Sequence, residues 1–264
     1  MRPFRHAPRG WPGGLWSAAA ALMLLYPLAG LFVPVGTWRW DDGGSTLAAV
    51  RVSLELTLLA MAVVVAVGTP MAIYIARRPP SERAWWQMIL LISVLLPPLA
   101  LGILLSLAFG PQTPAGQWLA QAGVRTSNSV PAFVVTQVYV SLGYYVLGAV
   151  SAIERVPRSL EIHAALLGHG SWSIFRRITF PLARLGLAVA LSLAWVRALG
   201  EFGAVMITAY YPAGIPVQLW VDLQNFGLPS VLPLLVVFLV AALPLPWLLH
   251  VLAQRQSSPT AEHA

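Results

Sequence analysis

The sequence contains no cysteine, no lysine and few charged residues, and each absence excludes a class of protein. Without cysteine there is no disulfide framework, no thiolate metal site and no cysteine nucleophile. Without lysine the chain cannot contain the phosphate-binding P-loop of an ATPase, because that motif needs its lysine. Charged residues make up 9% of the 264 residues, compared with about 25% in an ordinary soluble domain. The chain is therefore expected in a lipid bilayer.

Apolar residues dominate the chain, which is 58% hydrophobic with a mean hydropathy of +0.74. A membrane-crossing helix needs about 20 mainly apolar residues, and six runs meet that requirement. No polar block long enough to fold separately remains between them. The sequence therefore predicts one all-α domain over residues 1–264, a polytopic membrane protein with six transmembrane helices. The predicted spans are Trp16–Val35, Ala49–Ile75, Trp85–Phe109, Ala132–Ile153, Leu182–Tyr210 and Val231–Leu252.

The chain is basic, with a net charge of +7 that comes from 16 arginines. A basic excess can indicate nucleic-acid binding, but these arginines cluster at the ends of the apolar runs, as in membrane proteins whose basic loops lie inside. Six spans place both termini on one side, which carries 12 arginines against 3 on the other. We therefore expect cytoplasmic termini and no nucleic-acid partner. The 12 are Arg2, Arg5, Arg9, Arg77, Arg78, Arg83, Arg155, Arg158, Arg176, Arg177, Arg184 and Arg255; the 3 are Arg39, Arg51 and Arg125.

Residues 154–181 form a cytoplasmic loop that mixes charge, glycine and aromatic residues. Pro157 can start a helix, on which Leu160, Ala164 and Leu167 recur along one face. Gly168 can end that helix because glycine readily adopts the left-handed conformation. The pattern predicts a short amphipathic helix in this loop.

A second helical segment is expected from Ser171, as its cap, to Phe180. Trp172 and Phe175 offer an aromatic surface on this segment, and Pro181 opens the fifth span. The residues alone leave two interpretations open. The loop is either a helix pair lying on anionic lipid headgroups, as arginine-rich amphipathic stretches do readily, or a docking surface for a soluble cytoplasmic partner.

The fifth predicted span carries two charges, Arg197 and Glu201, in a setting where an unpaired charge is costly. Their spacing of four residues lets the side chains meet on one helical turn. Both project from the face that carries small residues suited to close helix packing. In one interpretation Arg197 and Glu201 form a structural ion pair. In the other the span lines a translocation path: Arg197 and the backbone donors of Gly200 and Gly203 meet a passing anion, and Glu201 partly neutralises Arg197. The small residues are Gly186, Ala190, Ala194 and Ala198.

The cytoplasmic loop resembles the EAA loop of permease subunits of ATP-binding-cassette (ABC) importers. That pattern is Glu-Ala-Ala, three residues, Gly, nine residues and Ile-x-Leu-Pro. Gly168 and the run from Ile178 to Pro181 keep the spacing, with phenylalanine in place of leucine, whereas Glu161 is displaced by one residue. The resemblance implies a coupling helix seated in a cleft of a separate ATPase subunit. The residues that it assigns to this coupling are Glu161, His163, Ala164, Gly168, Trp172, Phe175, Ile178 and Pro181.

The string Arg-Ala-Leu-Gly-Glu-Phe-Gly-Ala at residues 197–204 is similar to the corresponding segment of molybdate, tungstate and sulfate permeases. This resemblance implies the transmembrane domain of a type I ABC importer for an oxyanion, in a bacterial or archaeal cytoplasmic membrane. It also implies a second permease subunit, identical or paralogous, two cytoplasmic ATPase subunits and an extracytoplasmic solute-binding protein. The chain itself would need no cofactor, since the partner ATPase uses the ATP.

Other functions are compatible with the same residues. In an ion-coupled secondary transporter Glu201 would carry protons and no ATPase would be needed. An ABC permease for a different small solute would have the same coupling loop but a substrate other than an oxyanion. A membrane scaffold would use the arginine-rich loop without transporting anything. No nucleophile spacing or paired carboxylates indicate an enzyme, and the loop histidines lack a fixed geometry for a metal site.

Overall fold

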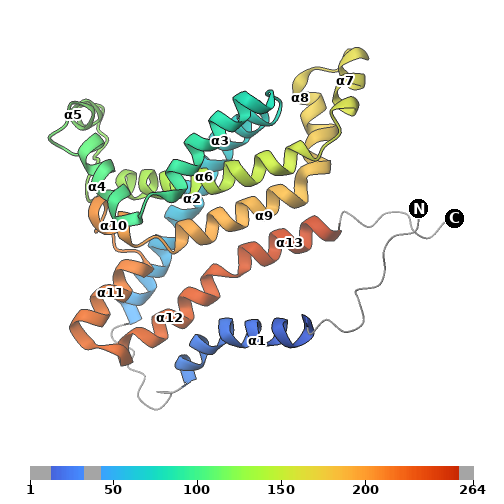
Figure 1. Ribbon diagram of the computed structural model, residues 1–264. Helices are drawn as coiled ribbons and strands as arrows, with labels where there is room; N and C mark the ends of the chain where they lie inside the picture. Colours follow the sequence, from blue (N-terminus) through green and yellow to red (C-terminus); the bar gives the residue numbers. More distant parts are fainter. Residues whose placement is uncertain (1–12, 33–42, 256–264) are drawn as a thin grey trace.

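The computed structural model describes residues 13–32 and 43–255, and this part of the chain is all-helical, as the sequence predicts. Helices α7 and α8 lie at one end of the bundle, and α5, α10 and α11 lie at the opposite end (Figure 1). The elements are α1 (Gly13–Leu25), η1 (Tyr26–Phe32), α2 (Gly43–Ala76), α3 (Pro80–Leu95), α4 (Pro98–Phe109), α5 (Pro114–Gln121), α6 (Val130–Glu154), α7 (Arg158–Leu166), α8 (Ser171–Ile174), η3 (Phe175–Thr179), α9 (Phe180–Leu199), α10 (Gly203–Thr208), α11 (Ile215–Phe226), α12 (Leu228–Ala242) and α13 (Pro244–Arg255).

Four helical segments in the described residues are long and apolar enough to cross a membrane: Gly44–Ala76, Val130–Glu154, Ser171–Leu199 and Leu228–Leu249. They correspond to the predicted second, fourth, fifth and sixth spans. The bent pair α3 and α4 makes a fifth candidate. The structure therefore supports up to five of the six predicted spans by length and composition.

The predicted first span is the one that falls short. It corresponds to a shorter apolar helix, Trp16–Leu31, made of α1 and the 3-10 turns of η1. Residues 33–35 of this span, and the three arginines at positions 2, 5 and 9, lie outside the described residues. A 13-residue α-helix followed by seven 3-10 residues measures roughly 33 Å, which is about the hydrocarbon thickness of a bilayer.

The predicted third span is broken in its middle rather than continuous. Helices α3 and α4 meet at 104°, and the break falls at Leu96, Pro97 and Pro98. Leu96 has an extended ψ of 125° and Pro97 a ψ of 138°. A proline disfavours the helical conformation of the residue before it and cannot donate the backbone bond that would continue the helix. Two consecutive prolines therefore turn the chain here.

The fifth span differs from its prediction at both ends. The helix begins at Ser171 and runs through Pro181, because the wider π-turn of η3, closed by the Phe180 N–H to the Phe175 carbonyl, precedes the proline. Pro181 lies in the first turn of α9, as predicted, but α9 continues without a break from η3 and α8. At the other end α9 stops at Leu199 and a separate short helix, α10, follows. The predicted continuation to Tyr210 is wrong.

Helix α6 lies at the centre of the core, packed against α2 on one side and α9 on the other. The predicted series of small residues on α9 forms the contact with α6: Ala190, Ala194 and Ala198 are buried. A Cβ added at Gly186 would lie 2.5 Å from the Cβ of Ala152, and one added at Gly148 would lie 2.7 Å from that of Ala190. Small residues on both helices thus let the two backbones approach closely.

We expect Gly186→Leu to lower the free energy of unfolding by about 2–3 kcal/mol, because the leucine would force α6 and α9 apart. Thermal unfolding of the purified protein in detergent measures the effect. The matched control is Gly14→Leu in α1, where an added Cβ meets nothing within 4 Å. Equal midpoints for the two variants would show that the α6–α9 contact does not depend on this glycine.

Candidate functional site: the cytoplasmic loop and the break after α9

Helix α7 in the predicted coupling loop ends as the sequence predicts. Gly168 has a φ of +85°, in the left-handed region that favours glycine. Its N–H donates to the Ala165 carbonyl at 3.0 Å, and the His169 N–H donates to the Ala164 carbonyl at 3.1 Å. This pair of bonds is a Schellman motif. The motif fixes the angle at which the chain leaves α7.

The apolar residues of α7 do not form the stripe that their spacing predicts. Ala164 is buried, but Leu167 lies at the end of the helix and is 81% exposed, next to Leu166 at 79%. Ile162 is also exposed. Apolar side chains gathered in this way on a loop beyond the spans indicate an interaction surface. The loop therefore turns its leucines outward, away from the bundle.

The second segment of the loop presents aromatic side chains. Trp172 is largely exposed, and its ring stacks on Phe175 with centroids 5.6 Å apart. The predicted cap is one residue off: Gly170 occupies the N-cap position, and Ser171 is the first helical residue and makes no capping bond. The aromatic surface is present, but a glycine rather than a serine begins the helix.

Glu161 points back into the bundle. Its Oε1 accepts from Arg77 Nη2 at 2.6 Å and from the Thr179 hydroxyl at 2.6 Å. Ile178 likewise packs against the main core, whereas His163 is exposed. The eight residues assigned to coupling thus divide into a group that anchors the loop and a group that faces outward. Glu161 fastens α7 to the C-terminal end of α2 and to the start of the fifth span.

We expect Glu161→Ala to lower the free energy of unfolding by about 1–3 kcal/mol, because it leaves Arg77 and Thr179, both near the loop, without their shared acceptor. The control is Glu82→Ala, which removes a more exposed pair with Arg78 at 3.5 Å and should change the unfolding free energy by less than about 1 kcal/mol. Equal effects would argue against an anchoring role for Glu161.

The second part of the site is the break between α9 and α10, where Arg197 and Glu201 meet as predicted. Arg197 Nη1 donates to Glu201 Oε2, and Glu201 Oε1 accepts from the Ala204 N–H at 2.6 Å. The Glu201 side chain is 1% exposed and that of Arg197 is 24% exposed. A carboxylate that binds the first N–H groups of a helix stabilises that helix. Glu201 therefore both neutralises Arg197 and caps α10.

The two glycines near Glu201 contribute to the end of α9 and to helix packing in this structure. The Gly200 N–H donates to the Val196 carbonyl at 3.1 Å, so it is not available as an anion donor in this structure. A Cβ added at Gly203 would lie 2.9 Å from the Cβ of Pro98. One added at Gly102 would lie 2.8 Å from the Cα of Ala204. Gly203 thus allows α10 to pack on α4, and the two broken spans meet where each of them breaks.

Sequence reasoning missed a polar side chain that ties the spans together at this level. Gln137 on α6 is buried, and its Nε2 donates to Thr57 Oγ1 at 2.9 Å and to the Ala198 carbonyl at 3.0 Å. One amide thus connects α2, α6 and the end of α9. Thr136 and Thr208 add a hydroxyl contact of 2.7 Å between α6 and α10. An amide inside an apolar run is the signal that could have found this network.

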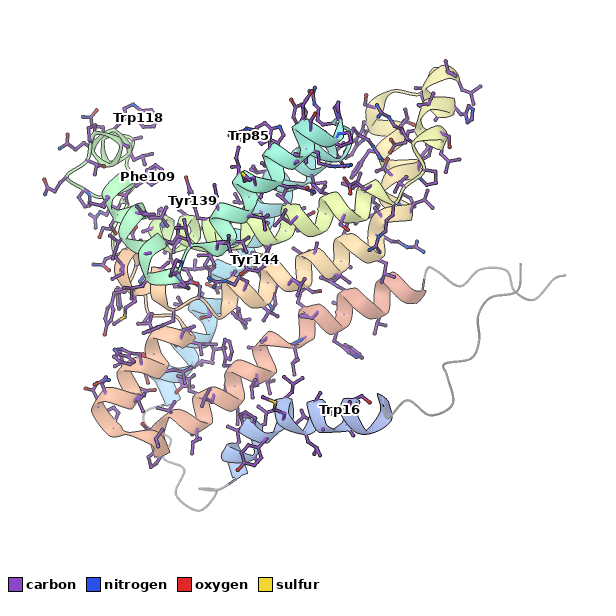
Figure 2. All side chains as sticks on the ribbon, viewed as in Figure 1. Trp16, Trp85, Phe109, Trp118, Tyr139 and Tyr144 are labelled. Atoms are coloured by element: carbon purple, nitrogen blue, oxygen red, sulfur yellow. The ribbon has the colours of Figure 1, made fainter. Side chains whose placement is uncertain are left out.

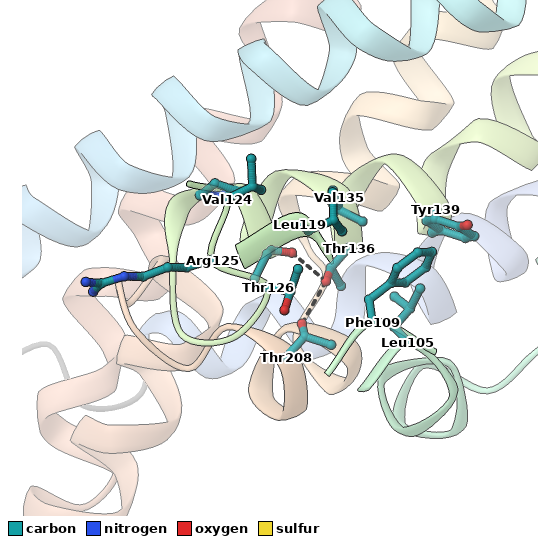
Figure 3. Close-up of a pocket in the computed structure, with 12 residues that line it drawn as sticks. Leu105, Phe109, Leu119, Val124, Arg125, Thr126, Val135, Thr136, Tyr139 and Thr208 are labelled. Carbon is teal, nitrogen blue, oxygen red and sulfur yellow. Dashed lines mark hydrogen bonds between the residues drawn. The ribbon is translucent and has the colours of Figure 1, made fainter. Parts of the chain in front are cut away.

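A pocket of about 290 Å³ lies between α4, α5, α6 and α10, next to these threonines. Figure 3 shows Thr136 and Thr208 joined inside it, while the side chain of Arg125 extends away from them. The remaining lining is mostly apolar, with Leu105 and Phe109 from α4. The pocket belongs to the packing around α10.

The sequence family described as "binding-protein-dependent transport system inner membrane component" matches residues 68–258, which include both parts of this site. The chain belongs to this family. It is a permease subunit of an ABC importer and a multi-pass membrane protein, and it has the apolar helices that such a protein requires.

Curated relatives of this permease extend the match over most of the chain. It is 31% identical over 264 residues to a probable molybdenum ABC transporter permease protein of Haloferax volcanii, covering 94% of this chain and 93% of that one. It is 30% identical over 215 residues to a molybdenum transport system permease protein of Mycobacterium bovis, covering 80% of this chain and 81% of that one. The relatives are transport permeases, not enzymes.

A solved structure shares the fold of this permease. A chain of a bacterial alginate ABC transporter, solved in complex with an alginate-bound periplasmic protein, superposes with a TM-score of 0.72 at 17% sequence identity. The match covers 94% of this chain and 95% of that one. At this identity the likeness concerns the fold alone. The break after α9 and the loop before it thus lie in an importer permease architecture.

Proposed function

We propose that the chain forms half of the translocation path of an ABC importer for a tetrahedral oxyanion of the molybdate, tungstate and sulfate class. The observation that carries this proposal is the match to permeases named for molybdenum transport, one of which aligns over 94% of the chain. Selectivity for one anion within the class would reside mainly in an external binding protein, because a path must release what it accepts.

Arg197 is the side chain that we assign to the anion. It lies at a break in a membrane helix, it is partly exposed, and its Cζ lies 5.9 Å from the centre of the Tyr144 ring. Glu201 holds part of the guanidinium, which weakens its attraction for an anion without removing it. A partly neutralised cation suits a path, since a strong site would retain the anion.

The subunit composition follows from the coupling loop. Two copies of this chain, or this chain and a paralogue, would enclose the path, with two cytoplasmic ATPase subunits on the α7 loops. Both termini would be cytoplasmic, which requires α1 and η1 to complete a sixth crossing. The external binding protein would dock near α11, a helix in the region 211–230, and near α5, whose Trp118 points away from the bundle (Figure 2). Binding of ATP would move the loops together and open the path outward.

Reconstitution of the assembled importer in proteoliposomes tests this function. With ATP and the ATPase on one side and the binding protein on the other, we expect uptake of labelled molybdate that tungstate or sulfate competes with. A neutral sugar should not compete. Uptake driven by a proton gradient without ATP would instead identify a secondary transporter, and ATP-dependent uptake of a solute that is not an oxyanion would overturn the substrate class.

A further inference from the structure

A second, larger cavity of about 800 Å³ lies at the cytoplasmic end of the spans. We name it the lipid-side groove. It lies between α2, α9, α13 and the aromatic segment 171–180, and its lining is almost wholly apolar. On its floor the hydroxyls of Thr69 and Tyr145 bond to each other at 2.7 Å, which satisfies both. Representative lining residues are Ala66, Ile73, Phe175, Leu187, Leu191 and Leu249.

The groove lies within the depth of one leaflet of a bilayer. On α2 its lining runs from Val65 to Ile73, a length of about 12 Å that begins three residues before the end of the helix. On α9 it runs from Arg184 to Leu191, about 10 Å. One leaflet of the hydrocarbon core is about 15 Å deep. The groove thus has the depth and the polarity of a site for an acyl chain.

Charge lies only at one end of this lining. Arg184 is the one charged side chain among the residues that line the groove, and it lies within the first five residues of α9. Trp172 and Phe175 lie at the same end, and Phe175 also contacts Phe180 with ring centroids 6.0 Å apart. Aromatic rings are enriched at the headgroup level of membranes, and basic pockets between membrane helices on the cytoplasmic side bind anionic headgroups.

We propose that the lipid-side groove binds an anionic phospholipid of the cytoplasmic leaflet, with its phosphate at Arg184 and an acyl chain along α2 and α9. The proposal needs the cytoplasmic placement of the loop but neither the oxyanion nor the ATPase. Trp172 and Phe175 belong to the coupling segment, so the bound lipid would contact the segment that follows α7 from the membrane side. A phospholipid would cover the apolar lining of the groove and pair its phosphate with Arg184 at the end of that lining.

Native mass spectrometry of the purified full-length permease, in detergent with added phosphatidylglycerol or phosphatidylcholine, measures the binding. We expect retention of phosphatidylglycerol in preference to phosphatidylcholine. Arg184→Gln should weaken the binding of phosphatidylglycerol about tenfold by removing a charge-assisted contact. Ala188→Trp, which fills the groove from α9, should remove both lipids. Arg125→Gln, an arginine on the opposite side, is the matched control and should leave retention unchanged.

Three results would overturn the proposal: equal retention of both lipids by the wild type, unchanged retention in Ala188→Trp, or a photoreactive residue at position 188 that labels a second copy of the chain instead of lipid. If Ala188→Trp fails to fold, Ala188→Leu takes its place in the same comparison. Transport is not the readout, so loss of the oxyanion function would leave the lipid result intact.

Discussion

Replacing Glu201 with alanine should unfold or misassemble the permease more severely than any other single substitution at the break after α9. The side chain is 1% exposed and takes two roles at once: it neutralises Arg197, and it accepts from the Ala204 N–H near the start of α10. Removing one partner of a buried pair costs about 3–5 kcal/mol, because the other charge stays behind. We expect a lower unfolding midpoint in detergent and a lower yield of assembled importer.

Three companion variants separate the structural role of this pair from the proposed role of Arg197 in the path. Glu201→Gln keeps an acceptor for Ala204 and should fold better than the alanine variant. Arg197→Met alone leaves the carboxylate buried without its partner and should destabilise the protein. The double variant Arg197→Met with Glu201→Gln removes both charges and keeps an acceptor for the Ala204 N–H, so neither a lone buried charge nor an unpaired N–H is left behind.

The double variant is the decisive one. If Arg197 meets the anion, this variant should recover the unfolding midpoint while uptake of molybdate stays at least tenfold below the wild type. Recovery of both stability and uptake would show that the pair only holds α9 and α10 together. Loss of both would leave the path role without support, since the effect could then be structural. The measurement thus compares two readouts in one protein.

Much of the fold follows from sequence periodicity and composition. The second, fourth and sixth spans lie close to their predicted bounds, because long apolar runs have few alternatives in a bilayer. The small residues of the fifth span lie on its packing face, as their spacing predicts, and Gly168 has the left-handed φ that its position in the loop predicts. Such features depend on local geometry, which a single sequence carries.

The remaining differences come from contacts between distant parts of the chain. Glu161 is displaced by one residue from the family pattern, and nothing local indicates that it turns inward to Arg77, 84 residues earlier. Gln137 likewise finds Thr57 and Ala198 on other helices. Two consecutive prolines predict that the helix breaks at Pro97, but they do not predict the angle of 104°. That angle depends on the packing of α4 on α10. Tertiary contacts therefore decide which residues of the site face the partner.

The contacts of the loop suggest a mechanical route from α7 to the break after α9. Glu161 and Thr179 join α7 to the root of the fifth span, and α9 ends at the break that α10 and α4 share. Gln137 holds the end of α9 against α2 and α6 at the same level. A displacement of α7 would therefore reach α4 through packed helices. This route requires a partner that binds α7, and the exposed Leu166 and Leu167 offer a surface for it.

Substituting both Leu166 and Leu167 with glutamate should abolish binding of the ATPase while the permease stays folded. Burying an exposed leucine contributes about 1.5–3 kcal/mol, so two lost contacts, with added charge, should weaken the association at least about a hundredfold. Both side chains are exposed in this structure, at 79% and 81%, so the unfolding midpoint should not change. Copurification of the ATPase with the tagged permease measures the loss, and molybdate uptake should fall with it.

The matched control replaces the same two leucines with methionine, which keeps the apolar area and should retain the ATPase. If the loop instead lies on the bilayer, the glutamate variant would still bind the ATPase, and an impermeant reagent would find residues 166 and 167 protected by lipid. Retention of the ATPase by the glutamate variant would therefore reject the coupling role of α7, whatever the fate of uptake. Loss of the ATPase with an unchanged midpoint can be explained only by a surface that the two leucines form for a partner outside the membrane.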